Sequence, residues 1–286
     1  MARPRPNLLL CLDAFGTLFR PKRTVAQQYG EVARRCGLVG FSDEELEISL
    51  RAAMKDEAKR NPNYGKATGL GATRWWANAA GAILFPRGVR RRAQPRIHPG
   101  GLRHQNTPQR RFERVVVGVV TNSDDRVPSI LSSLGIKVSP SRYGTAEAEP
   151  GAIAERQEDY DIDFHCMSYD VGAEKPDVRI FQAAELMLAR LIAVRDGKRP
   201  AEAAAESTSW QKVYVGDEYA KDVVGAVNAS WNPVLLDAED RSDGVPRLEH
   251  YPTRALDELF QEHAVVRVRS IQNLVSWLMG EGRSEP

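Results

Sequence analysis

Short apolar runs, each ending in polar residues, recur along this chain. Continuous runs of this kind are typical of parallel strands that are buried on both faces. Three of them are Leu8 to Leu12 ending at Asp13, Val115 to Val120 ending at Thr121-Asn122, and Val213 to Val215 ending at Gly216-Asp217. A fourth candidate is Val234 to Leu236, which ends at Asp237. The pattern therefore predicts several buried parallel strands with polar residues at their carboxyl ends.

Helical periodicity fills the intervals between these runs. Apolar residues recur at helical spacing at Ile180, Ala184, Met187, Leu188 and Leu191, and again at Ile271, Leu274, Val275 and Leu278. Alternating strands and helices predict an α/β fold with a Rossmann-like parallel sheet as its core. Because ligands of open parallel sheets bind beyond the carboxyl ends of the strands, we expect the polar strand ends to converge on one crevice.

An insertion separates the first two strands. Roughly 100 residues lie between them, far more than one crossover helix requires. Residues 24–60 read as helical, with one face formed by Val25, Tyr29, Val32, Ala33 and Cys36. We therefore predict a core of residues 1–19 and 113–286, and a helical cap of residues 20–112.

Composition narrows the class of protein. With 286 residues, of which 42% are hydrophobic and 27% charged, the chain matches an ordinary globular protein. Its apolar runs are much shorter than the roughly 18–20 residues of a membrane span, and no signal-peptide cleavage site follows the first run. Cys11, Cys36 and Cys166 lack metal-ligand or redox spacing, which predicts buried, reduced thiols. We expect a cytoplasmic or nuclear protein that is not secreted and does not bind membranes.

The net charge of +2 conceals a basic segment. Residues 58–112 contain twelve Lys or Arg and no acidic residue. Within it, the Arg- and Pro-rich residues 86–112 have few apolar residues and no acids to pair with, which predicts a disordered, exposed arm. Clustered Arg would suit nucleic acid, but the segment lacks the aromatic platforms that stack bases, so we do not expect nucleic-acid binding. Alternatively, this segment is the aberrant translation of a frame-shifted or non-coding stretch, which would leave the cap incomplete.

The first strand end carries a candidate nucleophile. Asp13 stands at the mouth of the sheet and is followed by Gly16-Thr17, a turn whose backbone N–H groups can bind an anion. The alternative is that Asp13 only caps a turn.

Other strand ends supply complementary groups. Thr121 and Asn122 offer a hydroxyl and an amide to an anionic group, and Lys175 stands before Pro176 at the entrance of the next helical stripe. Asp217, Glu218 and Asp222 place three carboxylates within six residues. Such an oxygen-rich cluster suits Mg²⁺, which is held by one or two carboxylates together with waters and phosphate oxygens.

Taken in this order, the four pieces resemble the motifs of the haloacid dehalogenase-like hydrolase superfamily. The resemblance implies Asp13 as nucleophile, Thr121 and Lys175 as the second and third motifs, and Asp217 with Asp222 as the fourth. It also implies Gly16, Thr17 and Asn122 as substrate-binding residues, and Asp13, Asp217, Asp222 and the backbone carbonyl of Phe15 as ligands of Mg²⁺. The cap resembles the haloacid dehalogenase-like hydrolase domain-containing protein 3 subfamily at Asn61-Pro62-Asn63-Tyr64-Gly65, Gly69-Leu70 and Trp75-Trp76. The two Trp residues would also serve as the core of the cap.

Phe15 departs from the phosphatases of this superfamily, which carry a general acid and base, Asp, at that position. Dehalogenases of the superfamily resemble the chain more closely here, since they carry an aromatic residue at this position, and a halide leaves without being protonated. The carboxylates of the fourth motif, by contrast, resemble the Mg²⁺-dependent branch. We therefore expect a hydrolase acting through an aspartate nucleophile on a small phosphorylated or halogenated organic acid. The alternative is a catalytically weak pseudoenzyme or interaction protein of the same fold. Substrate identity and oligomeric state are left open.

Overall fold

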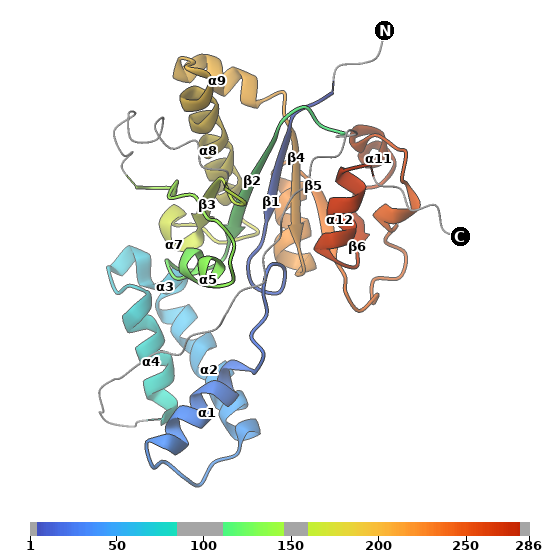
Figure 1. The fold of residues 1–286 in the computed structure, drawn as a ribbon. Helices are drawn as coiled ribbons and strands as arrows, with labels where there is room; N and C mark the ends of the chain where they lie inside the picture. Colours follow the sequence, from blue (N-terminus) through green and yellow to red (C-terminus); the bar gives the residue numbers. More distant parts are fainter. Residues whose placement is uncertain (1–4, 85–110, 146–159, 281–286) are drawn as a thin grey trace. The chain divides into compact units, whose positions relative to one another are not determined.

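The computed structural model describes residues 5–84, 111–145 and 160–280 (Figure 1). These residues form two compact units, one of residues 5–19, 111–145 and 160–280, and the other of residues 20–84. The predicted disordered arm, residues 86–112, lies outside the described residues except at its last two positions.

The first unit is built on a six-stranded parallel sheet in the order β3-β2-β1-β4-β5-β6 (Figure 1). Its strands are β1 (Leu8–Leu12), β2 (Val115–Thr121), β3 (Phe164–Met167), β4 (Gln211–Gly216), β5 (Asn232–Leu236) and β6 (Val266–Val268). The predicted α/β fold with a Rossmann-like core is thereby confirmed. The pattern did not predict β3, because this strand has only four residues and His165 interrupts its apolar run.

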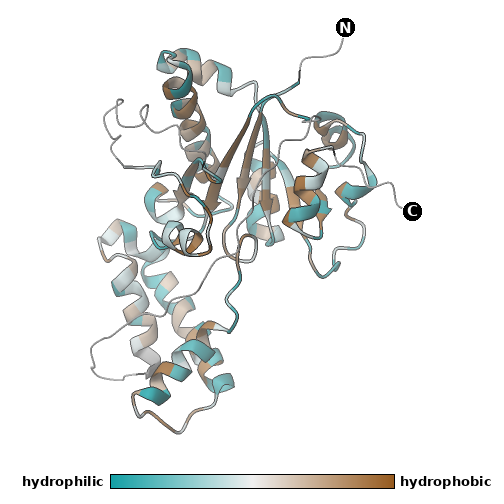
Figure 2. Ribbon diagram, in the orientation of Figure 1, coloured by the Kyte–Doolittle hydropathy of each residue, from teal (hydrophilic) through white to brown (hydrophobic). Residues whose placement is uncertain are grey.

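The central strand β1 shows why its five residues are continuously apolar. It pairs with β2 on one side and β4 on the other, and its successive side chains point to opposite faces of the sheet. Leu8, Leu10 and Leu12 pack into one core cluster and Leu9 and Cys11 into another. Both faces of β1 are therefore buried, and the strands at the centre of Figure 2 are correspondingly coloured as hydrophobic.

Helices cover both faces of the sheet. On the face of Leu9 lie α8 (Arg179–Asp196), α9 (Pro200–Ser207) and α10 (Val224–Asn228). On the face of Leu8 lie α11 (Leu256–Glu262), α12 (Ile271–Leu278) and, against Val119, α5 (Val127–Ser133). Every residue of the stripe predicted between Ile180 and Leu191 is buried on α8, which ends at the left-handed residue Gly197.

Phe112 contradicts the predicted end of the disordered arm. Its side chain is buried in the core cluster that contains Leu8. The neighbouring Arg111 donates hydrogen bonds to the carbonyls of Pro252 and Arg254, and its guanidinium lies 4.1 Å from the centre of the Trp277 ring. An apolar side chain next to a strand can pack into the core beneath that strand. This burial orders the residue even though the segment before it is polar.

The second unit is helical. It consists of α1 (Val25–Arg35), α2 (Asp43–Arg60), the short turn α3 (Pro62–Gly65) and α4 (Ala72–Leu84). Capping boxes start α1 at Thr24 and α2 at Ser42. The predicted face of α1 is wrong at Val32 and Cys36, which are exposed, because the buried face is Ala26, Gly30 and Ala33. Trp75 is buried and donates its ring N–H to the carbonyl of Asn61 at 3.0 Å, so it is core of this unit.

Cys11 and Cys166 are buried free thiols, as predicted, and burial raises the pKa of both. The prediction is wrong for Cys36, which is exposed. Among the described helices, none is sufficiently long and apolar to span a lipid bilayer.

Candidate active site

The β1 strand delivers Asp13 to the carboxyl edge of the sheet. Its backbone N–H donates to the carbonyl of Val215 at 2.9 Å, which extends the pairing of β1 with β4 by one residue. The chain then turns at Gly16, whose φ of 83° favours glycine, and the N–H of Gly16 donates to the carbonyl of Phe19 at 2.9 Å. A Cβ at Gly16 would overlap the Asp217 carboxylate. Glycine therefore lets the β1 and β4 ends approach each other.

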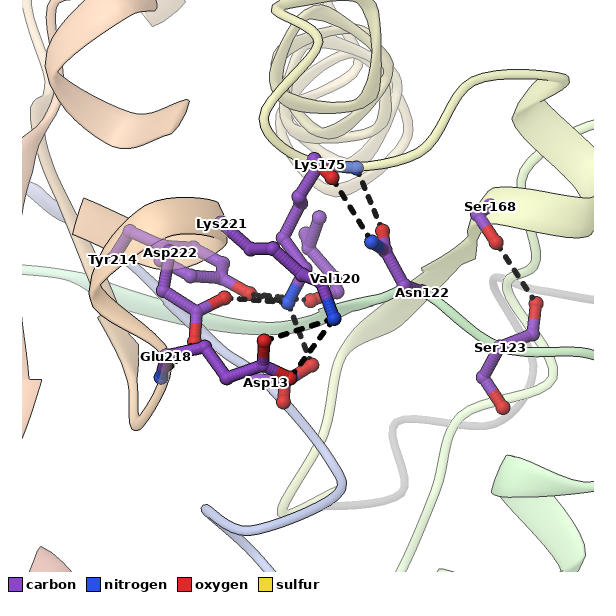
Figure 3. Close-up of polar contacts among 10 residues, drawn as sticks. All are labelled: Asp13, Val120, Asn122, Ser123, Ser168, Lys175, Tyr214, Glu218, Lys221 and Asp222. Atoms are coloured by element: carbon purple, nitrogen blue, oxygen red, sulfur yellow. Dashed lines mark hydrogen bonds and ion pairs between the residues drawn. The ribbon is translucent and has the colours of Figure 1, made fainter. Parts of the chain in front are cut away.

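Lys175 lies at the centre of the site, with only 4% of its surface exposed. Its ammonium donates to Asp13 Oδ1, Asp222 Oδ1 and the Tyr214 hydroxyl, each at 2.7 Å (Figure 3). An ammonium has three N–H donors, and these three partners use all of them. The predicted third motif is therefore fixed by side chains that lie just after β1, on β4, and in the π-helical turn Tyr219–Val223 that follows β4.

Three carboxylates lie close together at this edge of the sheet, and two of them bind the ammonium. Asp13, Asp217 and Asp222 each place one oxygen so that all three oxygens lie within 4.8 Å of one another. Asp222 Oδ2 also accepts the backbone N–H of Glu218 at 2.8 Å, and a Cβ at Gly216 would overlap the Asp222 side chain. One divalent cation with oxygen ligands at roughly 2.0–2.1 Å fits such a cluster.

Burial shapes the chemistry of Asp13. Desolvation raises its pKa above the usual range and the charge of Asp222 adds to this, while the Lys175 ammonium and a hydrogen bond from Thr121 act in the opposite direction. A cation bound among the carboxylates would favour the ionised form of Asp13.

Thr121 and Asn122, which follow each other in sequence, have different surroundings. Thr121 is buried and its side chain hydrogen-bonds the Asp13 carboxylate. The Asn122 amide accepts the backbone N–H of Lys175 at 2.7 Å and donates to the Lys175 carbonyl at 3.0 Å. Asn122 was predicted to hold substrate. In the structure its amide fixes the backbone of Lys175, and its contact with substrate stays a prediction.

The turn after Asp13 supplies the remaining predicted residues. Thr17 is buried, and its hydroxyl has no hydrogen-bond partner among the described residues. Phe15 is 43% exposed and its ring packs against Phe19 with the ring centres 4.6 Å apart. A phenyl ring has no ionisable group, so Phe15 cannot carry a proton at the site.

Sequence reasoning missed Tyr214. It lies on β4, fully surrounded by core residues, and its hydroxyl donates to the Val120 carbonyl at 2.7 Å. Burial raises its pKa, so the phenol stays protonated and neutral. The only available signal was a polar group between Val213 and Val215 in an otherwise apolar strand.

No protein-family model matches the chain. It is 28% identical over 243 residues to an uncharacterized hydrolase of Schizosaccharomyces pombe, covering 80% of this chain and 90% of that protein. It is 26% identical over 263 residues to mouse (Mus musculus) haloacid dehalogenase-like hydrolase domain-containing protein 3, covering 86% of this chain and 88% of the relative.

The predicted relationship to the haloacid dehalogenase-like hydrolases is confirmed. So is the predicted class of enzyme, a hydrolase. Among solved structures, a HAD-hydrolase of Bacillus subtilis bound to magnesium matches with a TM-score of 0.42 and 10% identity, over 96% of this chain and 99% of that chain.

Proposed function

We propose that this hydrolase cleaves a small phosphorylated organic acid, with Asp13 as the nucleophile and Mg²⁺ as the cofactor. The observation that carries the proposal is the convergence of three carboxylates and one buried ammonium at the carboxyl edge of the sheet. A carboxylate that only caps a turn would not need two further acids and a buried cation beside it. Burying charged groups is unfavourable unless they are paired or take part in function, which argues against the capping role.

In the proposed reaction an oxygen of Asp13 attacks phosphorus, and the bond from phosphorus to the leaving oxygen breaks. The product is an aspartyl phosphate, which water then hydrolyses to regenerate the carboxylate and release phosphate. Lys175 holds Asp13 in place and offsets its negative charge, and Thr121 donates to the same carboxylate. Asp13, Asp217, Asp222 and the Phe15 carbonyl would hold Mg²⁺, which supplies charge neutralisation to the transferring phosphoryl group.

A second candidate is hydrolysis of a 2-haloacid without metal, which Phe15 favours. A halide needs no proton to leave, whereas an alkoxide does, and no side chain at position 15 supplies one. In that reaction Asp13 attacks the carbon that bears the halogen and the carbon–halogen bond breaks to release halide. Water then hydrolyses the resulting ester to a 2-hydroxyacid and regenerates the carboxylate.

A substrate panel tests both candidates. Phosphate esters, acyl phosphates and 2-haloacids are assayed with Mg²⁺ and with a chelator. Turnover of phosphates that the chelator abolishes supports the proposal, and metal-independent release of halide supports the second candidate. No turnover of any compound would leave the pseudoenzyme or interaction protein of this fold.

Replacing Asp217 by Asn is expected to weaken Mg²⁺ binding by roughly tenfold or more, because it removes one of three converging negative charges. Calorimetric titration of Mg²⁺ and the Mg²⁺ concentration that gives half-maximal activity both measure this. Glu218→Gln is the matched control, since Glu218 is the exposed neighbour in the same loop. Equal Mg²⁺ affinity in Asp217→Asn and the wild type would exclude Asp217 as a ligand.

Replacing Phe15 by Asp is expected to raise activity toward alkyl phosphates more than toward aryl or acyl phosphates. The new carboxyl can protonate an alkoxide, and such general acid catalysis contributes about 10²–10⁴-fold, whereas good leaving groups need no proton. The exposed position of Phe15 accommodates the change. If both classes respond equally, or neither does, the missing acid is not what limits turnover.

A further inference from the structure

We propose that Tyr214 is a positioning residue whose hydroxyl tethers the Lys175 ammonium between Asp13 and Asp222. The inference rests on the proposed function, because Lys175 and Asp13 are placed in its catalytic machinery. Tyr214 itself is 1% exposed and lies beneath these side chains, so it does not contact substrate.

The hydroxyl is oriented by two hydrogen bonds in series. It donates its proton to the Val120 carbonyl on β2 and accepts one N–H of Lys175 Nζ, both at 2.7 Å (Figure 3). Since the donor is used by Val120, only a lone pair remains for Lys175. Toward the ammonium, the phenol oxygen therefore acts only as a hydrogen-bond acceptor.

The tether also links three neighbouring strands. Tyr214 pairs with Cys11 of β1, which in turn pairs with Gly118 of β2. The tyrosine side chain reaches beyond β1 to the carbonyl of Val120, two residues past Gly118. The ring also makes an edge contact with Phe181, whose ring centre lies 5.1 Å away.

The neutral character of the phenol is what distinguishes it from the other two partners. Asp13 and Asp222 attract the ammonium by charge, and a third carboxylate would add a further buried negative charge. A hydroxyl instead occupies the third N–H without changing the net charge of the cluster. Without it, the ammonium keeps two partners, and its third N–H, at a position shielded from solvent, has no acceptor. It would then settle closer to one carboxylate and misplace Asp13.

The test compares Tyr214→Phe with the wild type and with Phe181→Leu, which loosens packing around the same ring but keeps the hydroxyl. Two readouts are measured. One is kcat and KM on the best substrate of the panel. The other is the ¹⁵N signal of the Lys175 ammonium, assigned by its absence from Lys175→Met, which needs no turnover.

For Tyr214→Phe we expect kcat to fall roughly ten- to hundredfold, the size of one hydrogen bond to a charged group. KM is expected to stay within about twofold, and the ammonium signal to shift or to broaden through faster proton exchange. Phe181→Leu should keep that signal unchanged. An unchanged signal and kcat in Tyr214→Phe, or the same changes in Phe181→Leu, would overturn the proposal. A wild type that turns over no compound, although its ammonium signal depends on the Tyr214 hydroxyl, would overturn the proposed hydrolysis and leave the tether standing.

Discussion

Asp13→Asn is expected to lower kcat by at least about 10⁴-fold, because an amide oxygen cannot replace the attacking carboxylate. The substituted side chain can still accept the hydrogen bond from Lys175 through its Oδ1. Binding of substrate is therefore expected to survive the loss of turnover. The measurement is single-turnover kinetics together with equilibrium binding of a substrate that the wild type hydrolyses.

The same variant is expected to unfold no more easily than the wild type in the absence of metal. Burial raises the pKa of Asp13, so ionising this carboxyl weakens the folded state as the pH rises through that pKa. Asn cannot ionise, so the variant lacks this pH-dependent destabilisation. Any increase in its melting temperature over the wild type should disappear at acid pH, where Asp13 is protonated in both the folded and unfolded states.

Asp177→Asn is the control for the Asp13 variant. Asp177 lies near Lys175 in sequence, but it pairs with the exposed Arg179, which lowers its pKa. The Asp177→Asn variant should retain turnover. A catalytically competent Asp13→Asn would remove this residue from the role of nucleophile.

Lys175→Met is expected to lower the free energy of unfolding by about 3–5 kcal/mol, the range for breaking a buried ion pair. Asp13 and Asp222, both buried, would be left without their shared cation. Loss of the ammonium raises the pKa of Asp13 further, so the destabilisation should be largest at neutral pH and shrink as the pH falls through that raised pKa. Chemical denaturation at several pH values measures it, and added Mg²⁺ should restore part of the stability.

Lys221→Met separates a general loss of positive charge from the loss of this particular ammonium. Lys221 pairs with Glu218 at 2.8 Å, and both side chains are substantially exposed. Exposed pairs contribute little, so this variant should stay within about 1 kcal/mol of the wild type. Equal destabilisation by the two variants would contradict the central place given to Lys175.

The sheet illustrates which elements the chain pattern predicted and which it did not. The first run, Leu8 to Leu12, is a central strand with identical bounds in the structure, because a strand buried on both faces must be apolar at every position. β3 was missed because its own short sequence carries too weak a strand pattern. The strand is formed instead through its pairing with β2. Its N-terminal neighbour Asp163 accepts the Val117 N–H at 2.8 Å, a contact that exists only once β2 lies beside it.

The site shows the same division. Asp13, Thr121 and Asp217 could be placed together from the sequence, since each directly follows or ends a parallel strand, and such ends meet at one edge of the sheet. Lys175 could be added by its motif. That Asn122 would face the backbone of Lys175 could not be foreseen, because residues 53 positions apart are brought into contact only by the fold.

The sequence by itself determined the α/β class, the strand ends that carry chemistry and the identity of the acids, because hydrophobic periodicity and strand-end polarity are local properties of the chain. Only the tertiary structure decided that Lys175 is shared by Asp13, Asp222 and Tyr214. Those hydrogen bonds join residues that are 162, 47 and 39 positions apart. The direction of a buried side chain, and the partner that satisfies its last donor, depend on packing between elements, which no local pattern encodes.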